Sequence, residues 1–341
     1  MGTKSGFAAS VVCMRKSTIV TMTSRVLAAI ASVSLCATLA ACGSSDNTSK
    51  SSDKSSSDSS QSSSSSSSSA LKNMKQIPGL NVSGELGKKP TITFATPKTV
   101  DNNSYAIVQK GDGEVIGDKD RVCAQAVALS AKDGSELMST WEKNTPDCSL
   151  DMSSSDVSDA YREMIVGQKL NTTIAIGVND SNSSGTSYIM ALTLVSKTTD
   201  GTRATGDTVT DIPADLPKVT LGKNGKPSID MNGYTGSNSL VAQPLIKGKG
   251  AEVQESNTVK VQYTGWLLDG TQFDSSWDKG TPISFSLSQV VKGWTQGLTG
   301  QTVGSQVLLV VPPDLGYGNQ ASGSIPANST LVFVVDILAA Y

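Results

Sequence analysis

The stretch Val259-Lys260-Val261-Gln262-Tyr263-Thr264 is the clearest indication of the fold of the C-terminal part of this chain. Its apolar residues Val259, Val261 and Tyr263 alternate with polar ones, which is the two-residue period of a strand with one buried face. Asp269-Gly270 follows as a turn signal. We therefore predict an antiparallel strand pair around this turn.

More alternating runs flank this pair on the C-terminal side. They are Ile283, Phe285 and Leu287, then Val307, Leu309 and Val311, then Leu331, Phe333, Val335 and Ile337. One segment, from Gln289 to Leu298, instead has the apolar spacing of a helix, with Ser288 placed to cap its start. The pattern predicts an α+β fold in which an antiparallel sheet of about five strands wraps over one short helix.

The chain also repeats itself, which indicates two tandem domains. Four landmarks recur at an offset of 137 residues. They are Lys89-Pro90 with Lys226-Pro227, Gly111/Gly113 with Gly248/Gly250, Val122 with Val259, and Val166-Gly167 with Val303-Gly304. A fifth landmark, Asp133-Gly134, recurs as Asp269-Gly270 at an offset of 136. We predict domains at 76–200 and 218–341, joined by a linker at 201–217.

The N-terminal segment has the features of an export signal. An apolar run, Val26 to Leu39, follows basic residues and is too short to span a bilayer stably. It ends in Leu39-Ala40-Ala41-Cys42-Gly43, which resembles a bacterial lipobox. The resemblance implies a signal peptide at 1–41, lipid attachment at Cys42 and an extracytoplasmic protein anchored to the cell membrane. A secretory peptide cleaved nearby is the alternative.

Residues 42–75 are mostly serine and include an unbroken run from Ser62 to Ser69. Such a segment has little apolar surface to bury, so we predict a disordered tether. A glycosylated stalk is the alternative.

The composition excludes several classes of enzyme. The chain has no histidine, which removes Ser-His-Asp hydrolases, Cys-His proteases and histidine-ligated zinc sites. The formal net charge of −2 argues against a nucleic-acid partner. We expect no cofactor and no metal. Cys123 and Cys148 are the two cysteines that remain beyond Cys42, and in an oxidising compartment such a pair favours a disulfide.

A set of motifs in the C-terminal repeat resembles the FKBP-type peptidyl-prolyl cis-trans isomerase family in order and spacing. They are Val261-Gln262-Tyr263-Thr264-Gly265, Asp269-Gly270-Thr271-Gln272-Phe273-Asp274-Ser275-Ser276, Val290-Val291-Lys292-Gly293-Trp294, Pro313-Asp314-Leu315-Gly316-Tyr317-Gly318, Ile325-Pro326 and Leu331-Val332-Phe333. The match covers about 248–338.

The resemblance implies a role for each pocket residue. Trp294 forms the floor beneath the substrate proline ring, Ile283 forms a rim, and the walls are Tyr263, Phe273, Val290, Val291 and Phe333. The Val291 backbone N–H and the Tyr317 hydroxyl donate hydrogen bonds to the peptide. Asp274 organises polar contacts at the pocket edge, and Ile325 lies in the loop that closes over the ligand.

The residue types suit this chemistry on physical grounds. The prolyl amide resists rotation with a barrier of about 18–20 kcal/mol, because resonance makes it planar. Twisting the bond leaves less charge on the carbonyl oxygen, so a dry aromatic pocket favours the twisted form without a covalent step. Partners are then proline-containing unfolded or exported polypeptides, and by family resemblance a macrolide ligand. A non-catalytic module that holds unfolded clients is the alternative.

The first repeat lacks this set of residues. At the repeat offset Tyr263 corresponds to Ala126, Phe273 to Leu137 and Asp274 to Met138, and the region of Trp294 falls near Val157. We therefore predict a degenerate domain that keeps its core and has lost the pocket. It is interpreted as a spacer or as a surface for clients.

Overall fold

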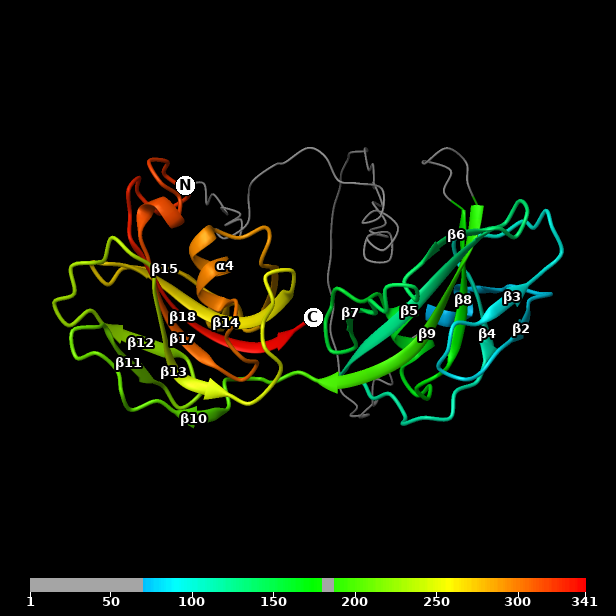
Figure 1. Cartoon of the computed structure of the whole chain (residues 1–341), viewed down its shortest axis with the longest axis horizontal. Coiled ribbons are helices and arrows are strands. Elements are labelled where there is room, and N and C mark those ends of the chain that lie inside the picture. The colour runs from blue at the N-terminus through cyan, green and yellow to red at the C-terminus, as the bar shows by residue number, and fades with distance from the viewer. Residues whose placement is uncertain (1–69, 180–186) are drawn as a thin grey trace, which may run out of the picture.

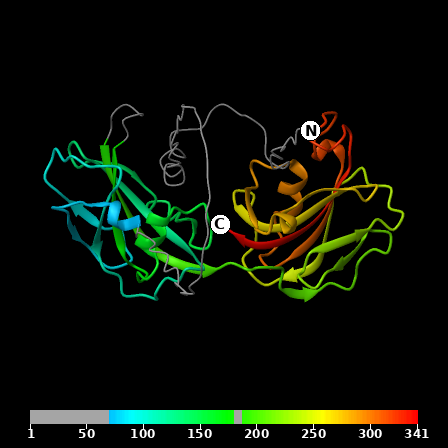
Figure 2. The same ribbon diagram turned by 180° about the vertical axis from the view of Figure 1, so that it is seen from behind.

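The computed structural model describes residues 70–179 and 187–341 of the chain. The predicted signal peptide, the predicted lipobox and nearly all of the predicted tether lie outside the described residues. Within them, none of the helices combines the length and the apolar character needed to cross a membrane. Figures 1 and 2 show two lobes side by side, joined by one crossing segment. We call residues 70–179 and 187–200 the N-terminal lobe and residues 206–341 the C-terminal lobe.

The C-terminal lobe is built on a seven-stranded sheet. Its order is β10 (Gly206–Thr208), β13 (Val241–Gly248), β17 (Gln306–Val311), β18 (Leu331–Ala340), β14 (Thr258–Leu267) and β15 (Gln272–Ser275), and β16 (Ile283–Ser286) also pairs with β14. All these pairs are antiparallel. Helix α4 (Lys292–Leu298) packs on one face, and its Trp294 and Leu298 enter the main core.

The opposite face of this sheet is also covered, which the alternating pattern did not predict. The hairpin of β11 (Lys218–Leu221) and β12 (Pro227–Asp230) packs against it through Val219 and Ile229. Every residue of β17 is therefore buried. This second cover explains why β17 reads Val-Leu-Leu-Val-Val rather than as a strict alternation.

The N-terminal lobe has a second seven-stranded sheet. Its order is β1 (Lys75–Gln76), β4 (Ser104–Gln109), β8 (Thr173–Asn179), β9 (Ser187–Thr199), β5 (Asp120–Ser130) and β6 (Glu136–Ser139), and β7 (Asp147–Asp151) pairs with β5. Helix α2 (Asp159–Ile165) packs on one face, and the hairpin of β2 (Asn81–Ser83) and β3 (Thr91–Thr93) on the other.

Each sheet has seven strands where we predicted about five. In the C-terminal lobe the two additional strands are β10 and β13. β10 has three residues, too few to show a period, and most of the eight residues of β13 are partly buried without a regular alternation. Two further short elements are the 3-10 helices η1 (Ala70–Asn73) and η2 (Pro313–Leu315), and one helical turn, α3 (Ser276–Lys279), follows β15.

Two boundaries differ from the sequence prediction. Residues 70–75, predicted as tether, form η1 and the start of β1, and the Ala70 and Leu71 N–H groups donate to the Glu163 carboxylate on α2. The predicted linker 201–217 contains β10, which pairs with β13, and Leu216, which is buried against the C-terminal sheet. Both segments therefore lie against a folded lobe.

The start of α4 also differs from the prediction. The helix begins at Lys292 with Val291 as its N-cap, whereas the pattern placed the cap at Ser288. The Ser288 hydroxyl instead lies 2.9 Å from that of Ser286 at the end of β16.

Candidate active site

Four aromatic side chains meet at the centre of the C-terminal lobe. Trp294 comes from α4, Tyr263 from β14, Phe333 from β18 and Phe285 from β16. The Trp294 ring lies 5.3 Å from both the Tyr263 and Phe333 rings, in edge-to-face contacts. Phe285 makes similar contacts with Trp294 at 5.5 Å and Tyr263 at 5.9 Å. Such pairs hold the rings in fixed orientations and build a rigid aromatic base.

Phe285 is a member that the sequence argument did not assign to the pocket. It stands on the same side of β16 as Ile283, two residues away, and its period-2 alternation with Ile283 and Leu287 was the signal for it. The alternation shows that Phe285 is buried but not which rings it contacts.

The wall above this base is formed by Phe273 on β15. Its ring is half-buried and stands 5.5 Å from that of Phe333 at nearly a right angle. Gly265 makes this contact possible, because a Cβ atom there would lie 2.6 Å from the Phe273 ring and 2.9 Å from the Phe333 ring. The two rings therefore occupy the space of a missing side chain.

Asp274 sits at the edge of the cluster and is 8% exposed. One carboxylate oxygen accepts a hydrogen bond from the Tyr263 hydroxyl. The other accepts from the Ser275 N–H at 2.9 Å and forms an ion pair with Lys279 Nζ at 2.6 Å. Three donors thus surround the carboxylate, so its structural role is to fix Tyr263.

Lys279 was not predicted as a site residue. It ends the single turn of α3, five residues after Asp274, and this turn brings its ammonium group back to the carboxylate. A charged residue in a polar stretch carries no signal of its partner in the sequence.

The remaining predicted site residues border the same core. Those that are partly buried and pack against it are Ile283, Val290, Val291 and Tyr317, whereas Ile325 is fully buried within it. Val291 is the N-cap of α4. It therefore lies at the end of the helix where the backbone N–H groups have no acceptor within the helix. Tyr317 follows η2 in the connection between β17 and β18. All ten pocket residues predicted from sequence are therefore in or against one cluster.

Two cavities of the described residues are lined by none of the ten predicted pocket residues. One, of about 560 Å³, lies along the crossing segment and is lined by residues such as Arg203, Thr205 and Gly304. The other, of about 220 Å³, lies between the lobes. In the same part of the chain, no group of three or more Cys, Asp or Glu side chains is placed to hold a metal ion.

The part of the chain that forms this aromatic cluster is similar to known proteins. The model of the family FKBP-type peptidyl-prolyl cis-trans isomerase matches residues 249–338. The FK506-binding protein of Neisseria meningitidis is 42% identical over 106 residues, which are 30% of this chain and 97% of that protein. The chain belongs to the FKBP-type peptidyl-prolyl cis-trans isomerase family. We call residues 249–338 the FKBP region.

Other relatives match the FKBP region only as part of a larger protein. FkpA of Escherichia coli, an FKBP-type peptidyl-prolyl cis-trans isomerase, is 47% identical over 104 residues. The match spans 30% of this chain and 38% of FkpA. A crystal structure of FkpA aligns with 36% of this chain and 51% of its own chain, at 40% identity and a TM-score of 0.29.

Matching hydrogen bonds relate the FKBP region to the N-terminal lobe residue by residue. The Tyr263 N–H donates to the Ser276 hydroxyl at 2.8 Å, and the Ala126 N–H donates to the Thr140 hydroxyl at 2.9 Å. Gly265 pairs with Asp274 between β14 and β15, and Ala128 pairs with Met138 between β5 and β6.

This register gives the correspondence that the repeat predicts at three positions. Ala126 stands in place of Tyr263, Leu137 in place of Phe273 and Met138 in place of Asp274. Leu137 is 49% exposed, and the aromatic wall and its carboxylate have no counterpart in this part of the described structure.

The predicted counterpart of Trp294 was wrong. Trp294 is the third residue of α4, and the third residue of α2 is Tyr161, not Val157. Equivalent hydrogen bonds at the helix ends support this: Gln168 N–H to Ile165 O at 3.0 Å, and Gln301 N–H to Leu298 O at 3.1 Å. The constant offset failed here because the segment before α2 is longer than the one before α4.

The same shift changes one repeat landmark. Gly167 corresponds to Gly300, since their N–H groups donate at 2.9 Å to Ile116 and Val253 respectively. The Gly250 N–H donates to the Val303 carbonyl at 2.9 Å, and the Gly113 N–H donates to the Leu170 carbonyl at 3.1 Å. Val303 therefore corresponds to Leu170. The coincidence of Val166-Gly167 with Val303-Gly304 was therefore accidental.

The two cysteines of the N-terminal lobe form a disulfide in the structure. It joins Cys123 on β5 to Cys148 on the edge strand β7, across a sequence separation of 25. The two residues stand where the register between these strands shifts. The disulfide therefore ties down an edge strand at the point where its ladder is interrupted.

Proposed function

We propose that the protein catalyses cis–trans isomerisation of Xaa-Pro bonds in the aromatic pocket of the FKBP region. One observation carries the proposal: Trp294, Tyr263 and Phe333 form a rigid buried base, and the half-buried Phe273 ring stands above it as a wall. A proline ring placed on this base is removed from water on several sides.

The pocket favours rotation by its dryness and its shape. The planar amide has the larger charge on its carbonyl oxygen, so loss of water costs the planar form more than the twisted one. The Val291 N–H at the α4 N-terminus and the Tyr317 hydroxyl are the donors assigned to the bound peptide. Ile325, buried in the connection between β17 and β18, supports the loop over the site.

Acid–base catalysis is not part of the proposed mechanism. The chain has no histidine, and the buried carboxylate of Asp274 already accepts from Tyr263, Ser275 and Lys279. Asp274 therefore acts as a positioning residue that holds the Tyr263 ring.

We further propose that the N-terminal lobe is a degenerate FKBP-like domain. The matching strand order, the equivalent hydrogen bonds and the loss of the pocket residues support this assignment. The lipobox-like sequence that ends at Cys42 supports the further proposal of an extracytoplasmic lipoprotein, whose clients would then be exported, proline-containing polypeptides. Relatives named FK506-binding protein make a macrolide the expected inhibitor.

The test compares matched substitutions in the full chain. Phe273→Ala removes the pocket wall and should lower kcat/KM about tenfold on a prolyl tetrapeptide, since a buried Phe side chain contributes about 1.5–3 kcal/mol. Leu137→Ala, the same truncation at the corresponding exposed position, should leave it unchanged. Wild-type protein that binds proline-containing peptides without turnover would favour the alternative, a non-catalytic binding module.

The anchoring is tested separately. Wild-type protein should partition with membranes, and Cys42→Ser should release it. Equal partition of both proteins would refute the lipid anchor.

A further inference from the structure

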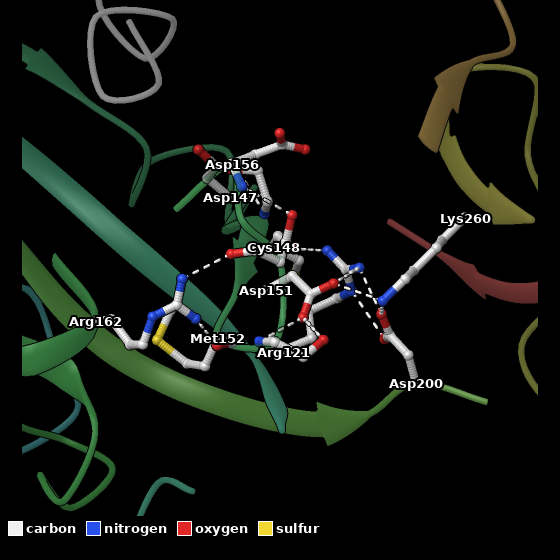
Figure 3. A network of polar contacts seen from close by, with 12 residues as sticks. Arg121, Asp147, Cys148, Asp151, Met152, Asp156, Arg162, Asp200 and Lys260 are labelled. Atoms are coloured by element: carbon white, nitrogen blue, oxygen red, sulfur yellow. Dashed lines mark hydrogen bonds and ion pairs between the residues drawn. The ribbon is translucent and has the colours of Figure 1, made fainter. Parts of the chain in front are cut away.

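The two lobes meet at a cluster of buried charges. Lys260 from β14 inserts its ammonium group between Asp151 of β7 and Asp200, with Nζ–O distances of 2.6 and 2.9 Å (Figure 3). Arg121 of β5 contacts the same two carboxylates at 3.3 and 2.5 Å. Two cations and two carboxylates therefore cancel in this contact.

An aromatic contact extends the interface. The guanidinium of Arg121 lies 3.9 Å from the centre of the Tyr341 ring, at the end of the C-terminal lobe that reaches the N-terminal lobe in Figures 1 and 2. Charge pairing and cation–π attraction together hold one lobe against the other. The interface is thus a defined surface of the protein.

A cavity of about 220 Å³ opens beside this cluster, and both lobes line it. Its apolar parts are Leu150, Val157 and the rings of Tyr161 and Tyr341, and its polar parts are mostly serine hydroxyls. The volume is below the roughly 300–1,000 Å³ of ordinary small-molecule pockets. It therefore suits one long side chain rather than a cofactor.

The cavity adjoins the rim of the prolyl pocket. Ser284 lines the cavity, and its chain neighbour Ile283 packs against the pocket core. Both belong to β16, where Lys260 pairs with Ser284 and Val261 with Ile283. Since successive side chains of a strand point to opposite faces, the pocket and the cavity are separated by the thickness of this edge strand.

The charge of the lining selects a type of side chain. Asp151 and Arg121 are neutralised within the cluster, whereas Asp156, also on the lining, makes no ion pair with any described residue. The lining therefore carries one exposed carboxylate without an ion-pair partner among the described residues, beside apolar surface. A cation at the end of an aliphatic stem matches both features.

We propose that this interlobe cavity is a second subsite for the client, which takes a lysine or arginine side chain that flanks the isomerised proline. The inference rests on the proposed function, because the client reaches the cavity by extending from the prolyl pocket across β16. The N-terminal lobe is then a specificity element of the isomerase, and Asp156 determines its preference for a basic side chain.

The experiment uses the full chain and fluorescently labelled decapeptides that contain one Ala-Pro bond. Lys, Gln or Glu is placed in turn at each position from two to five residues on either side of that bond. Binding is measured by fluorescence polarisation, which requires no turnover, and kcat/KM is measured in parallel. The matched variants are Asp156→Asn and Asp159→Asn, since Asp159 is a nearby carboxylate that does not line the cavity.

The expected result is a preference for Lys over Gln at one position by about two- to fivefold, as for partly exposed charge pairs. Asp156→Asn should bring this ratio to about one, and about 0.5 M salt should reduce it. Asp159→Asn should keep the wild-type ratio. Peptides that bind without any turnover would sink the proposed function and leave the subsite testable by binding.

Two outcomes would overturn the subsite. One is equal binding of the Lys and Gln peptides at every position. The other is a Lys preference that is the same in Asp156→Asn as in wild type.

Discussion

The Lys260 ammonium group lies 2.6 Å from a carboxylate oxygen of Asp151, although the two residues are 109 positions apart. The contact joins β14, which carries Tyr263 of the pocket, to the edge strand β7 of the other lobe. We therefore expect a substitution at this pair to affect the contact between the lobes more than the geometry of the pocket.

Lys260→Met should therefore loosen the contact between the lobes and destabilise the protein. Removing one partner of a buried ion pair costs about 3–5 kcal/mol, and we expect about 2 kcal/mol here because Arg121 still compensates both carboxylates. Denaturant unfolding provides the measurement. Lys249→Met is the control, since Lys249 and Asp207 form an ion pair with side chains 72% and 75% exposed, and its loss should cost under about 1 kcal/mol.

The same contact should depend on pH at both ends of the scale. Burial lowers the pKa of Lys260, but hydrogen bonds to Asp151 and Asp200 outweigh it and raise the pKa above 10.5. Burial raises the pKa of Asp151, but the hydrogen bonds from Lys260 and Ser153 and the positive charge of Lys260 together outweigh it and bring the pKa below 3.8.

The signs follow from linkage. The Lys260 contribution is complete below pH 10.5 and is lost as the pH rises through the higher folded pKa. The Asp151 contribution is present above pH 3.8 and is lost as the pH falls through the lower folded pKa. Stability scans of wild type minus Lys260→Met should show a plateau between these limits. A difference that varies across neutral pH would contradict this assignment.

Gly265→Ala should damage the pocket wall without touching a polar group. The new Cβ would meet the Phe273 ring at 2.6 Å and the Phe333 ring at 2.9 Å, so one ring has to move. Overpacking of this kind costs about 1–3 kcal/mol, and we expect kcat/KM to fall about tenfold. At the corresponding position of the other lobe, Ala128→Gly should cost up to about 1 kcal/mol and leave turnover unchanged. Full activity in Gly265→Ala would mean that Phe273 is not a wall of the site.

Asp274→Asn distinguishes a positioning carboxylate from a catalytic acid or base. The amide keeps an acceptor for the Tyr263 hydroxyl and loses the ion pair with Lys279. Loss of one hydrogen bond is worth about 0.5–1.5 kcal/mol, so kcat/KM should fall by at most about tenfold. We expect a flat pH–rate profile through neutrality in both proteins, with Asp278→Asn as the control on α3. A folded but inactive variant, together with a single ionisation in the wild-type profile, would force a return to acid–base catalysis.

Reduction of the Cys123–Cys148 disulfide should act on the N-terminal lobe. Opening a loop of this length removes about 3 kcal/mol of stability on a chain-entropy estimate. Hydrogen exchange resolved by mass spectrometry should show faster exchange in β5 and β7 of a Cys123→Ala, Cys148→Ala protein, with β17 and β18 unchanged. Equal protection of β7 in the two proteins would show that its ladder alone holds it.

Much of the arrangement at the core of the C-terminal lobe could be predicted from local sequence patterns. Period-2 alternation places Tyr263 and Phe333 on the buried face of their strands, and helical spacing turns Trp294 inward, so each side chain points to the core for local reasons. Family order then identified Phe273, Asp274 and Tyr317, which carry little signal alone. Counting the cysteines left a single pair for the disulfide.

The contacts between residues far apart in the chain could not be predicted from local patterns and are known only from the three-dimensional structure. The partners of Asp274 and Lys260, the second cover of each sheet and the counterpart of Trp294 all depend on turn lengths and on how the lobes pack. A hydrophobic period reports whether a position is buried, because burial repeats with the geometry of one element. A charged side chain shows no such period, and its partner is set by where the whole chain brings a second charge.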